Sequence, residues 1–125
     1  MVVGLGTDLI EISRIAQTVD RFGDRFLRRI FTPSEAAYCM RKRSAAESLA
    51  ARFAAKEAAA KALGTGISYG VSWLEMEVTR ERSGAPGMVL SGRAAERAAR
   101  LGVKRISVSL THARDAALAV VIMED

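Results

Sequence analysis

An alanine-rich segment between Ser44 and Gly64 is the strongest structural signal in the sequence. Alanine has the highest helix propensity of all residues, and glycine commonly follows the last turn of a helix. Ser44-Ala45-Ala46-Glu47 has the pattern of a capping box, in which the serine and the glutamate satisfy the first amide groups. We therefore expect a central helix that Gly64 terminates. At about 100° per residue, one of its faces carries Leu49, Phe53, Ala60 and Leu63.

Apolar stretches on both sides of this helix have the pattern of β-strands. The first covers residues 2–12 and has glycines at positions 4 and 6. Alternation over 74–79 and 106–111, a short run at 88–90 and a long apolar run at 116–123 predict four more strands. Residues 83–87 form a turn, and the loop 112–115 makes a hairpin of the last two strands.

Shorter helices are expected between these strands. Ser13 is expected to cap a helix with Ile15, Val19 and Phe22 at helical spacing, which Gly23-Asp24 interrupts. Thr32-Pro33-Ser34-Glu35 is a capping box that opens a helix toward Met40, and a helix over 93–101 follows Ser91 and ends at Gly102. With 125 residues, 50% of them hydrophobic, the chain fits one α+β domain over residues 1–125 with a largely antiparallel sheet.

The formal net charge of +5 comes from one segment of the chain. Between Arg14 and Arg43 there are eight basic and three acidic residues, whereas the remaining residues hold equal numbers of both. A concentrated basic surface attracts nucleic acid, an anionic membrane or an acidic protein, and the plain alternative is a solvated arginine-rich face.

The sequence also indicates a compartment. No apolar run approaches the roughly 20 residues that span a bilayer, and the N-terminal apolar stretch contains Asp8 and Glu11 without a preceding basic region. These features argue against a membrane protein and against a secretory signal. The single cysteine, Cys39, forms no internal disulfide, which favours a reducing compartment. We expect a soluble cytoplasmic protein.

Five side chains are candidates for chemistry, each with a plain alternative. Glu57 and Lys61 lie together on the flank of the central helix, where a surface ion pair contributes about 0.3–0.5 kcal/mol. Lys56 points among the apolar residues of that helix, so it has to snorkel or meet another element or a ligand. Asp8 lies in an apolar strand, either as a cap for the next turn or as a metal ligand, since two carboxylates from separate elements suit Mg²⁺. His112 lies where a strand leaves the sheet, and a single histidine there is more often a structural hydrogen-bonding residue.

These residues fall into the pattern of a known family. Gly6-Thr7-Asp8-Leu9-Ile10-Glu11-Ile12 resembles the first signature of the holo-acyl-carrier-protein synthases, the small phosphopantetheinyl transferases. Phe53-Ala54-Ala55-Lys56-Glu57-Ala58-Ala59-Ala60-Lys61 is similar to their second signature, and Ser109-Leu110-Thr111-His112 to their late Ser-x-Ser/Thr-His element. Order and spacing match from end to end. One departure, Gly84-Ala85-Pro86 in place of the frequent Gly-Lys-Pro, affects one possible phosphate contact and not the reaction class.

The resemblance implies transfer of 4′-phosphopantetheine from coenzyme A to a serine of apo-acyl carrier protein, with release of adenosine 3′,5′-bisphosphate. It implies that Asp8 and Glu57 hold Mg²⁺, that Lys61 neutralises the pyrophosphate, and that Glu57, directly or through bound water, accepts the serine proton. Small and basic residues are implied around the nucleotide end of coenzyme A: Lys61, Gly64, Gly66, Pro86, His112 and, from the basic run 41–43, Arg43.

An acidic acyl carrier protein would give the basic segment a partner. On one helical projection the arginines that lie within about 60° of each other are Arg14, Arg21, Arg25 and Arg28, although Gly23 interrupts the helix. Phe26 and Leu27 are expected to supply the apolar part of this docking surface. Family members are homotrimers with the active site at the subunit boundary, so a trimer is expected by analogy.

The alternative from another class is a basic nucleic-acid-binding module that uses the same arginines on phosphates. This alternative leaves Asp8 and Glu57 without a purpose, and the aromatic content of 6% does not favour a base-stacking surface.

Overall fold

The computed structural model describes residues 1–67 and 69–125. The first half of the chain contains β1 (Val2–Glu11), α1 (Ile12–Phe22), α2 (Asp24–Ile30), α3 (Pro33–Met40) and α4 (Ala45–Ala62). The second half contains the short 3-10 helix η1 (Trp73–Glu75), β2 (Met76–Arg80), β3 (Pro86–Leu90), α5 (Gly92–Leu101), β4 (Arg105–His112) and β5 (Ala116–Glu124). Among the helices of these ranges, none is long and apolar enough to cross a membrane.

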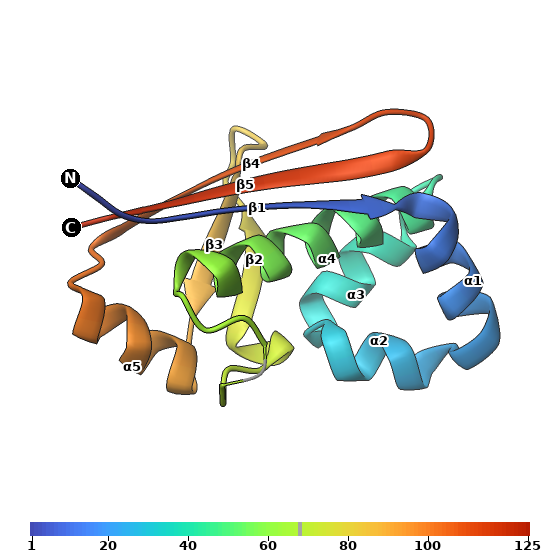
Figure 1. Ribbon diagram of the computed structural model, residues 1–125. Helices are drawn as coiled ribbons and strands as arrows, with labels where there is room; N and C mark the ends of the chain where they lie inside the picture. The colour runs from blue at the N-terminus through green and yellow to red at the C-terminus, as the bar shows by residue number, and fades with distance from the viewer. Residues whose placement is uncertain (68) are drawn as a thin grey trace.

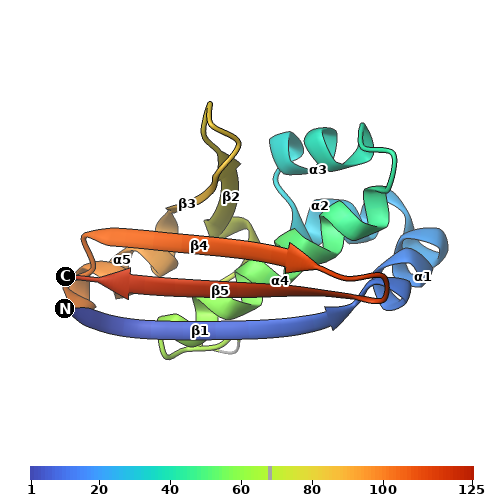
Figure 2. The same cartoon turned by 90° about the horizontal axis from the view of Figure 1, so that it is seen from above.

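Two antiparallel sheets form the β part of the domain. The main sheet has the order β1-β5-β4, so the last strand of the chain lies between the first strand and its own hairpin partner. The hairpin β2–β3 forms a separate two-stranded sheet. Figure 1 shows the helices on one side of the main sheet, and Figure 2 shows α4 running beneath its strands. The predicted α+β class with largely antiparallel strands is confirmed.

Two glycines allow α4 to lie directly against β1. A Cβ atom at Gly4 would collide with the backbone carbonyl of Ala62, and one at Gly6 with the backbone carbonyl of Ala58. Only a residue without a side chain lets two backbones approach this closely. The glycines therefore hold the last two turns of α4 against the part of β1 that leads into Asp8.

The core is built on the alanines of α4, which are buried on most sides of the helix. On one side they pack against buried residues of the main sheet, such as Ala119, Val121 and Met123, and on the other against β2 and α5. The expectation that another element meets the helix at Lys56 is confirmed. Lys56 is fully buried, and its Nζ donates to Glu35 Oε1 at 2.7 Å and to the carbonyl of Trp73 at 3.0 Å.

Two predicted helix caps differ in the structure because long-range contacts replace them. Ser44 precedes α4 but its side chain accepts no capping hydrogen bond, and Glu47 pairs with His112 instead of completing the box. Helix α1 begins at Ile12, one residue before Ser13, because the amide of Ile12 donates to the carbonyl of Asp115 in the β4–β5 loop. The capping box at Thr32 and Glu35 is confirmed.

The first hairpin also differs at its ends. Leu74, expected in a strand, lies in η1, because the carboxylate of Glu75 accepts hydrogen bonds from the amides of Ser72 and Arg93 and bends the chain there. Pro86 and Gly87, expected in the turn, pair with Arg80 and Thr79 as the start of β3.

The outer face of the main sheet carries aliphatic side chains along β1 and β5, whereas the outward residues of β4 are polar. Leu5 and Leu9 are 63% and 65% exposed, and their strand partners Ile122 and Leu118 lie on the same face. The described helices all lie on the side of the opposite face, which α4 covers (Figures 1 and 2). This leaves a row of aliphatic side chains on the outside of the molecule.

Candidate active site

Three charged side chains from β1 and α4 meet where the two glycines bring the backbones together. Lys61 Nζ lies 3.1 Å from Asp8 Oδ1 and donates to the carbonyl of Thr7 at 3.0 Å. Glu57 lies one turn earlier on α4 and is close enough to Asp8 and Lys61 for both charges to affect its pKa. Lys61 pairs with Asp8, so the simple surface pair between Glu57 and Lys61 is not what the structure contains.

The electrostatics of this cluster disfavour a charge on Glu57. Burial raises the pKa of the Glu57 carboxyl, the negative charge of Asp8 raises it further, and Lys61 only partly offsets them. Two carboxylates that repel each other at a partly exposed position are suited to hold a cation. Among the described residues no three or more His, Cys, Asp or Glu side chains gather as a metal site, so a cation here would take its further ligands from substrate or water.

The turn after α4 lies beside this cluster. Gly64 and Gly66 have positive φ values of 77° and 57°, which favour glycine. The amides of Gly64, Thr65 and Gly66 all donate to the last carbonyls of α4. The turn therefore presents a small, open surface, whereas its amides are occupied in closing the helix and are not free phosphate donors.

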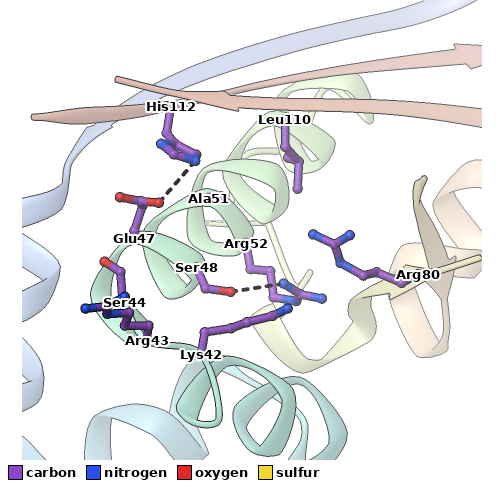
Figure 3. Close-up of a pocket in the computed structure, with 10 residues that line it drawn as sticks. All are labelled: Lys42, Arg43, Ser44, Glu47, Ser48, Ala51, Arg52, Arg80, Leu110 and His112. Atoms are coloured by element: carbon purple, nitrogen blue, oxygen red, sulfur yellow. Dashed lines mark hydrogen bonds and ion pairs between the residues drawn. The ribbon is translucent and has the colours of Figure 1, made fainter. Parts of the chain in front are cut away.

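A basic pocket lies at the other end of α4 (Figure 3). It has a volume of about 490 Å³, and its polar lining includes Lys42, Arg43, Ser44, Glu47, Ser48, Arg52, Arg80 and His112. His112 Nε2 lies 3.1 Å from Glu47 Oε1, which ties the end of β4 to the first turn of α4. Glu47 is the one acidic side chain in this lining, so the pocket is suited to an anion with more than one charge.

Arg52 and Arg80 were not identified from the sequence. Arg52 is only 4% exposed, and its Nε has no hydrogen-bond partner among the described residues. Such an atom is costly to bury unless a ligand or water satisfies it. A single arginine among the buried alanines of α4 was a usable signal for Arg52. Nothing local marks Arg80, which reaches the pocket only because of how the hairpin β2–β3 packs.

The predicted site residues form two groups within one chain. Asp8, Glu57 and Lys61 lie near the C-terminal end of α4 together with Gly64 and Gly66. Arg43 and His112 line the basic pocket, and Pro86 is the strand partner of Arg80 beside it. Glu47 and Lys61 are separated by about 20 Å along the helix axis, at 1.5 Å per residue. A single chain therefore does not bring the two groups together around one small ligand.

The four arginines of the expected docking surface lie on two helices. Arg14 and Arg21 belong to α1, Arg25 and Arg28 to α2, and Gly23 separates the helices with φ 54°. A single helical projection is therefore wrong for the set, although all four side chains are exposed.

The apolar part of this surface also differs from the expectation. Leu27 is buried and belongs to the core. Phe26 lines a hollow of about 390 Å³ together with Phe22, Trp73, Arg25 and Arg29. In place of the expected patch of Phe26 and Leu27, Arg25 and Arg29 line a hollow with three aromatic side chains.

Comparisons with known proteins give a matching family model and similar structures. The model of the 4′-phosphopantetheinyl transferase superfamily matches residues 4–121. The chain is 54% identical over 125 residues to a holo-acyl-carrier-protein synthase from Koribacter versatilis, with 100% of both chains covered. Its fold is similar to the crystal structure of the holo-acyl-carrier-protein synthase from Neisseria meningitidis, with a TM-score of 0.89, 36% identity and 100% of both chains covered. It is also similar to the Helicobacter pylori holo-acyl-carrier-protein synthase in complex with coenzyme A, with a TM-score of 0.85 and 35% identity over 96% of this chain and 99% of that one.

Proposed function

The chain belongs to the 4′-phosphopantetheinyl transferase superfamily, and on that basis we propose that it transfers 4′-phosphopantetheine from coenzyme A to a serine of an apo-acyl carrier protein. The serine oxygen forms a bond to the phosphorus that carries pantetheine. The bond from that phosphorus to the bridging oxygen of the pyrophosphate breaks, and adenosine 3′,5′-bisphosphate leaves with that oxygen. The serine proton passes to a base.

The observation that carries the proposal is the cluster of Asp8, Glu57 and Lys61. Two carboxylates from separate elements, with no third protein ligand in the described chain, suit Mg²⁺ better than a metal that needs a full protein cage. The donor set fits, so Asp8 and Glu57 would hold Mg²⁺. When bound, the cation would neutralise charge on the pyrophosphate.

The remaining chemistry falls to side chains of this cluster. Lys61, which is half-exposed, provides a positive charge for the leaving phosphate oxygens. Glu57 is the candidate acceptor of the serine proton, because its carboxylate lies beside the place where the pyrophosphate would bind.

The basic pocket would receive the nucleotide end of coenzyme A. Arg43, Arg52 and His112 line this pocket, and the buried Nε of Arg52 has no hydrogen-bond partner among the described residues. Phosphate monoesters accept strong charge-assisted hydrogen bonds from arginine. Pro86, beside Arg80 on the hairpin, and the small Gly64 and Gly66 at the far end of α4 would border the same ligand.

A ligand that touches both ends of α4 suggests that two chains build each site. The aliphatic side chains on the outer face of the main sheet, with Leu5 and Leu9 more than half exposed, support association through this face. We propose a homotrimer in which one chain supplies the Asp8 cluster and its neighbour supplies the basic pocket.

The acidic carrier protein would dock on α1 and α2. Arg14, Arg21, Arg25 and Arg28 are exposed on these helices, and Arg25 also lines the hollow formed with Phe22, Phe26 and Trp73. Positive side chains around an aromatic centre have the composition of a protein-binding surface. We place the enzyme in the cytoplasm, where the buried free thiol of Cys39 remains reduced.

Mass spectrometry of an apo-acyl carrier protein tests the reaction. After incubation with this protein, coenzyme A and Mg²⁺, we expect the carrier to gain the mass of one phosphopantetheine, and EDTA to prevent the gain. A carrier variant with alanine at the acceptor serine is the control. No gain of mass, together with salt-dependent binding to unrelated DNA, would favour the nucleic-acid alternative.

A further inference from the structure

Three cationic side chains surround one tyrosine at the edge of the basic pocket. Measured to the centroid of the Tyr38 ring, Arg52 Cζ lies at 4.3 Å, Lys42 Nζ at 4.6 Å and Arg80 Cζ at 5.1 Å. Arg52 comes from the middle of α4, Lys42 from the segment that follows α3, and Arg80 from the end of β2. The electron-rich ring attracts each cation, whereas the cations repel one another.

The nearby acids are occupied by other groups. Among the described residues, no carboxylate forms an ion pair with Lys42, Arg52 or Arg80. Glu47 pairs with His112 and Glu35 with Lys56. Glu77 accepts hydrogen bonds from the hydroxyl groups of Thr32 and Ser34 at the start of α3. The positive charge around Tyr38 is therefore available to a ligand.

Tyr38 itself responds to these charges. Burial pushes the pKa of its hydroxyl upward, but the neighbouring Lys42, Arg80 and Arg52 outweigh burial, so the pKa lies below its ordinary value. This agrees with the close approach of three cations that the distances show.

Arg80 is held so that its guanidinium faces this group. Its Nη1 donates to the carbonyl of Gly84 across the turn at 2.8 Å, and the ring of Tyr38 supports the guanidinium from α3. The other N–H groups of the guanidinium have no hydrogen-bond partner among the described residues. Figure 3 shows Arg80 reaching toward the pocket from the hairpin and Arg52 from α4.

We propose that Arg80 binds the 3′-phosphate monoester of coenzyme A, and that Tyr38 is the positioning residue that holds Arg80 beside Arg52. The inference rests on the proposed function and adds the hairpin β2–β3 to the phosphate-binding surface. Arg52 is fixed and buried, whereas Arg80 is exposed and stands at the entrance. A phosphate monoester with two negative charges matches two guanidinium groups that approach it from different elements.

Calorimetric titration with two ligands tests this role. Coenzyme A and 3′-dephospho-coenzyme A differ by one phosphate, so the ratio of their affinities isolates the contribution of that group. We expect Arg80→Ala to weaken coenzyme A binding by about tenfold or more and to leave 3′-dephospho-coenzyme A binding unchanged. Arg80→Lys keeps the charge without the planar fork and is expected to fall between the two. Arg82→Ala, in the same turn but outside the pocket lining, is the control and should bind both ligands normally.

Tyr38 variants test the positioning part. Tyr38→Phe keeps the ring and should keep the preference for coenzyme A, whereas Tyr38→Leu should lose most of it. An Arg80→Ala protein that loses both ligands equally, or neither, would overturn the assignment. A wild-type protein that binds no coenzyme A would instead overturn the proposed function, so the two failures are distinguishable.

Discussion

Glu57 carries a charge that its surroundings in the metal-free protein disfavour. Burial and the adjacent Asp8 both raise its pKa, so the ionised carboxylate costs stability at neutral pH. Functional sites often keep such a cost because the same charge is needed for activity.

Replacing Glu57 by its uncharged amide is therefore expected to separate stability from activity. In Glu57→Gln we expect the metal-free Tm to rise by about 2–4 °C, as the repulsion from Asp8 is removed, and transfer to fall by about a hundredfold or more. Mg²⁺ should raise the Tm of the wild type by mass action and have little effect on the variant. Thermal melts with and without Mg²⁺ measure this. A variant with a lower Tm than the wild type would contradict the account of the charge.

Lys56, the residue before Glu57, forms a buried ion pair with Glu35. Burial lowers the pKa of Lys56 and Glu35 only partly offsets this, so each charge of the pair depends on the other. Lys56→Met should destabilise the protein by about 3 kcal/mol, because it leaves the buried Glu35 without its cation. The double variant Glu35→Gln/Lys56→Met should recover part of this loss. Urea unfolding gives both values. If Lys56→Met is as stable as the wild type, the pair does not hold α3 against α4.

At the level of secondary-structure elements, the break at Gly23 divides the arginines between two helices. Gly23 has φ 54° and ψ −130°, a conformation that permits α2 to turn away from α1. Helix α1 then carries Arg14 and Arg21, while α2 supplies Phe26 and two further arginines to the aromatic hollow. We expect charge on α1 to guide the carrier protein, and α2 to make the closer contacts.

Charge reversal on α1 tests this division. Arg21→Glu should raise the KM for the carrier protein by about tenfold and leave the KM for coenzyme A nearly unchanged, because exposed charges act mainly on encounter. Salt should reduce the difference, since the screening length falls from about 10 Å at 0.1 M to about 3 Å at 1 M. Arg100→Glu, an equally exposed reversal on α5, is the matched control. Equal loss for both substrates would point to damage of the active site.

Local sequence patterns predicted most of the helices and strands but few of the contacts between them. The helix α4, the Thr32 capping box and the hairpin β4–β5 follow from residues that are neighbours in sequence. The caps at Ser13 and Ser44 were wrong because partners far along the chain, Asp115 and His112, decide those positions. The contact between Arg80 and Tyr38 likewise depends on long-range packing, and no periodicity in the sequence predicts it. Asp8 was found as a candidate because its charge interrupts an apolar strand pattern, and Glu57 because it lies four residues before Lys61 on the flank of the central helix.

For the whole molecule, the two groups of site residues lie about 20 Å apart on α4, and this separation is the reason for proposing a trimer. In this proposal the exposed aliphatic side chains of β1 on the outer face of the main sheet form part of the contact between chains. If neighbouring chains complete each site, defects in different groups can be carried by different chains.

Mixed trimers test this proposal. Asp8→Ala chains and Arg43→Ala/His112→Ala chains should each be nearly inactive alone. Co-expressed with different tags and purified through both, they should regain about one third of the wild-type activity, because each mixed ring has one site with two intact halves. Asp8→Ala combined with Glu57→Gln chains, defective in the same group, should regain none. No recovery in the first mixture would mean that each chain works alone.

The contact of Gly4 and Gly6 with the carbonyls of α4 has a consequence for laboratory evolution of this protein. The separation of Asp8 from Glu57 depends on two backbones in direct contact, and the bulk of the surrounding hydrophobic residues does not set it. A library selected for heat resistance should therefore accept many exchanges among the buried aliphatic positions without loss of turnover. At positions 4 and 6 every surviving clone should retain glycine, since even one methyl group there would move the strand and its carboxylate away from the helix.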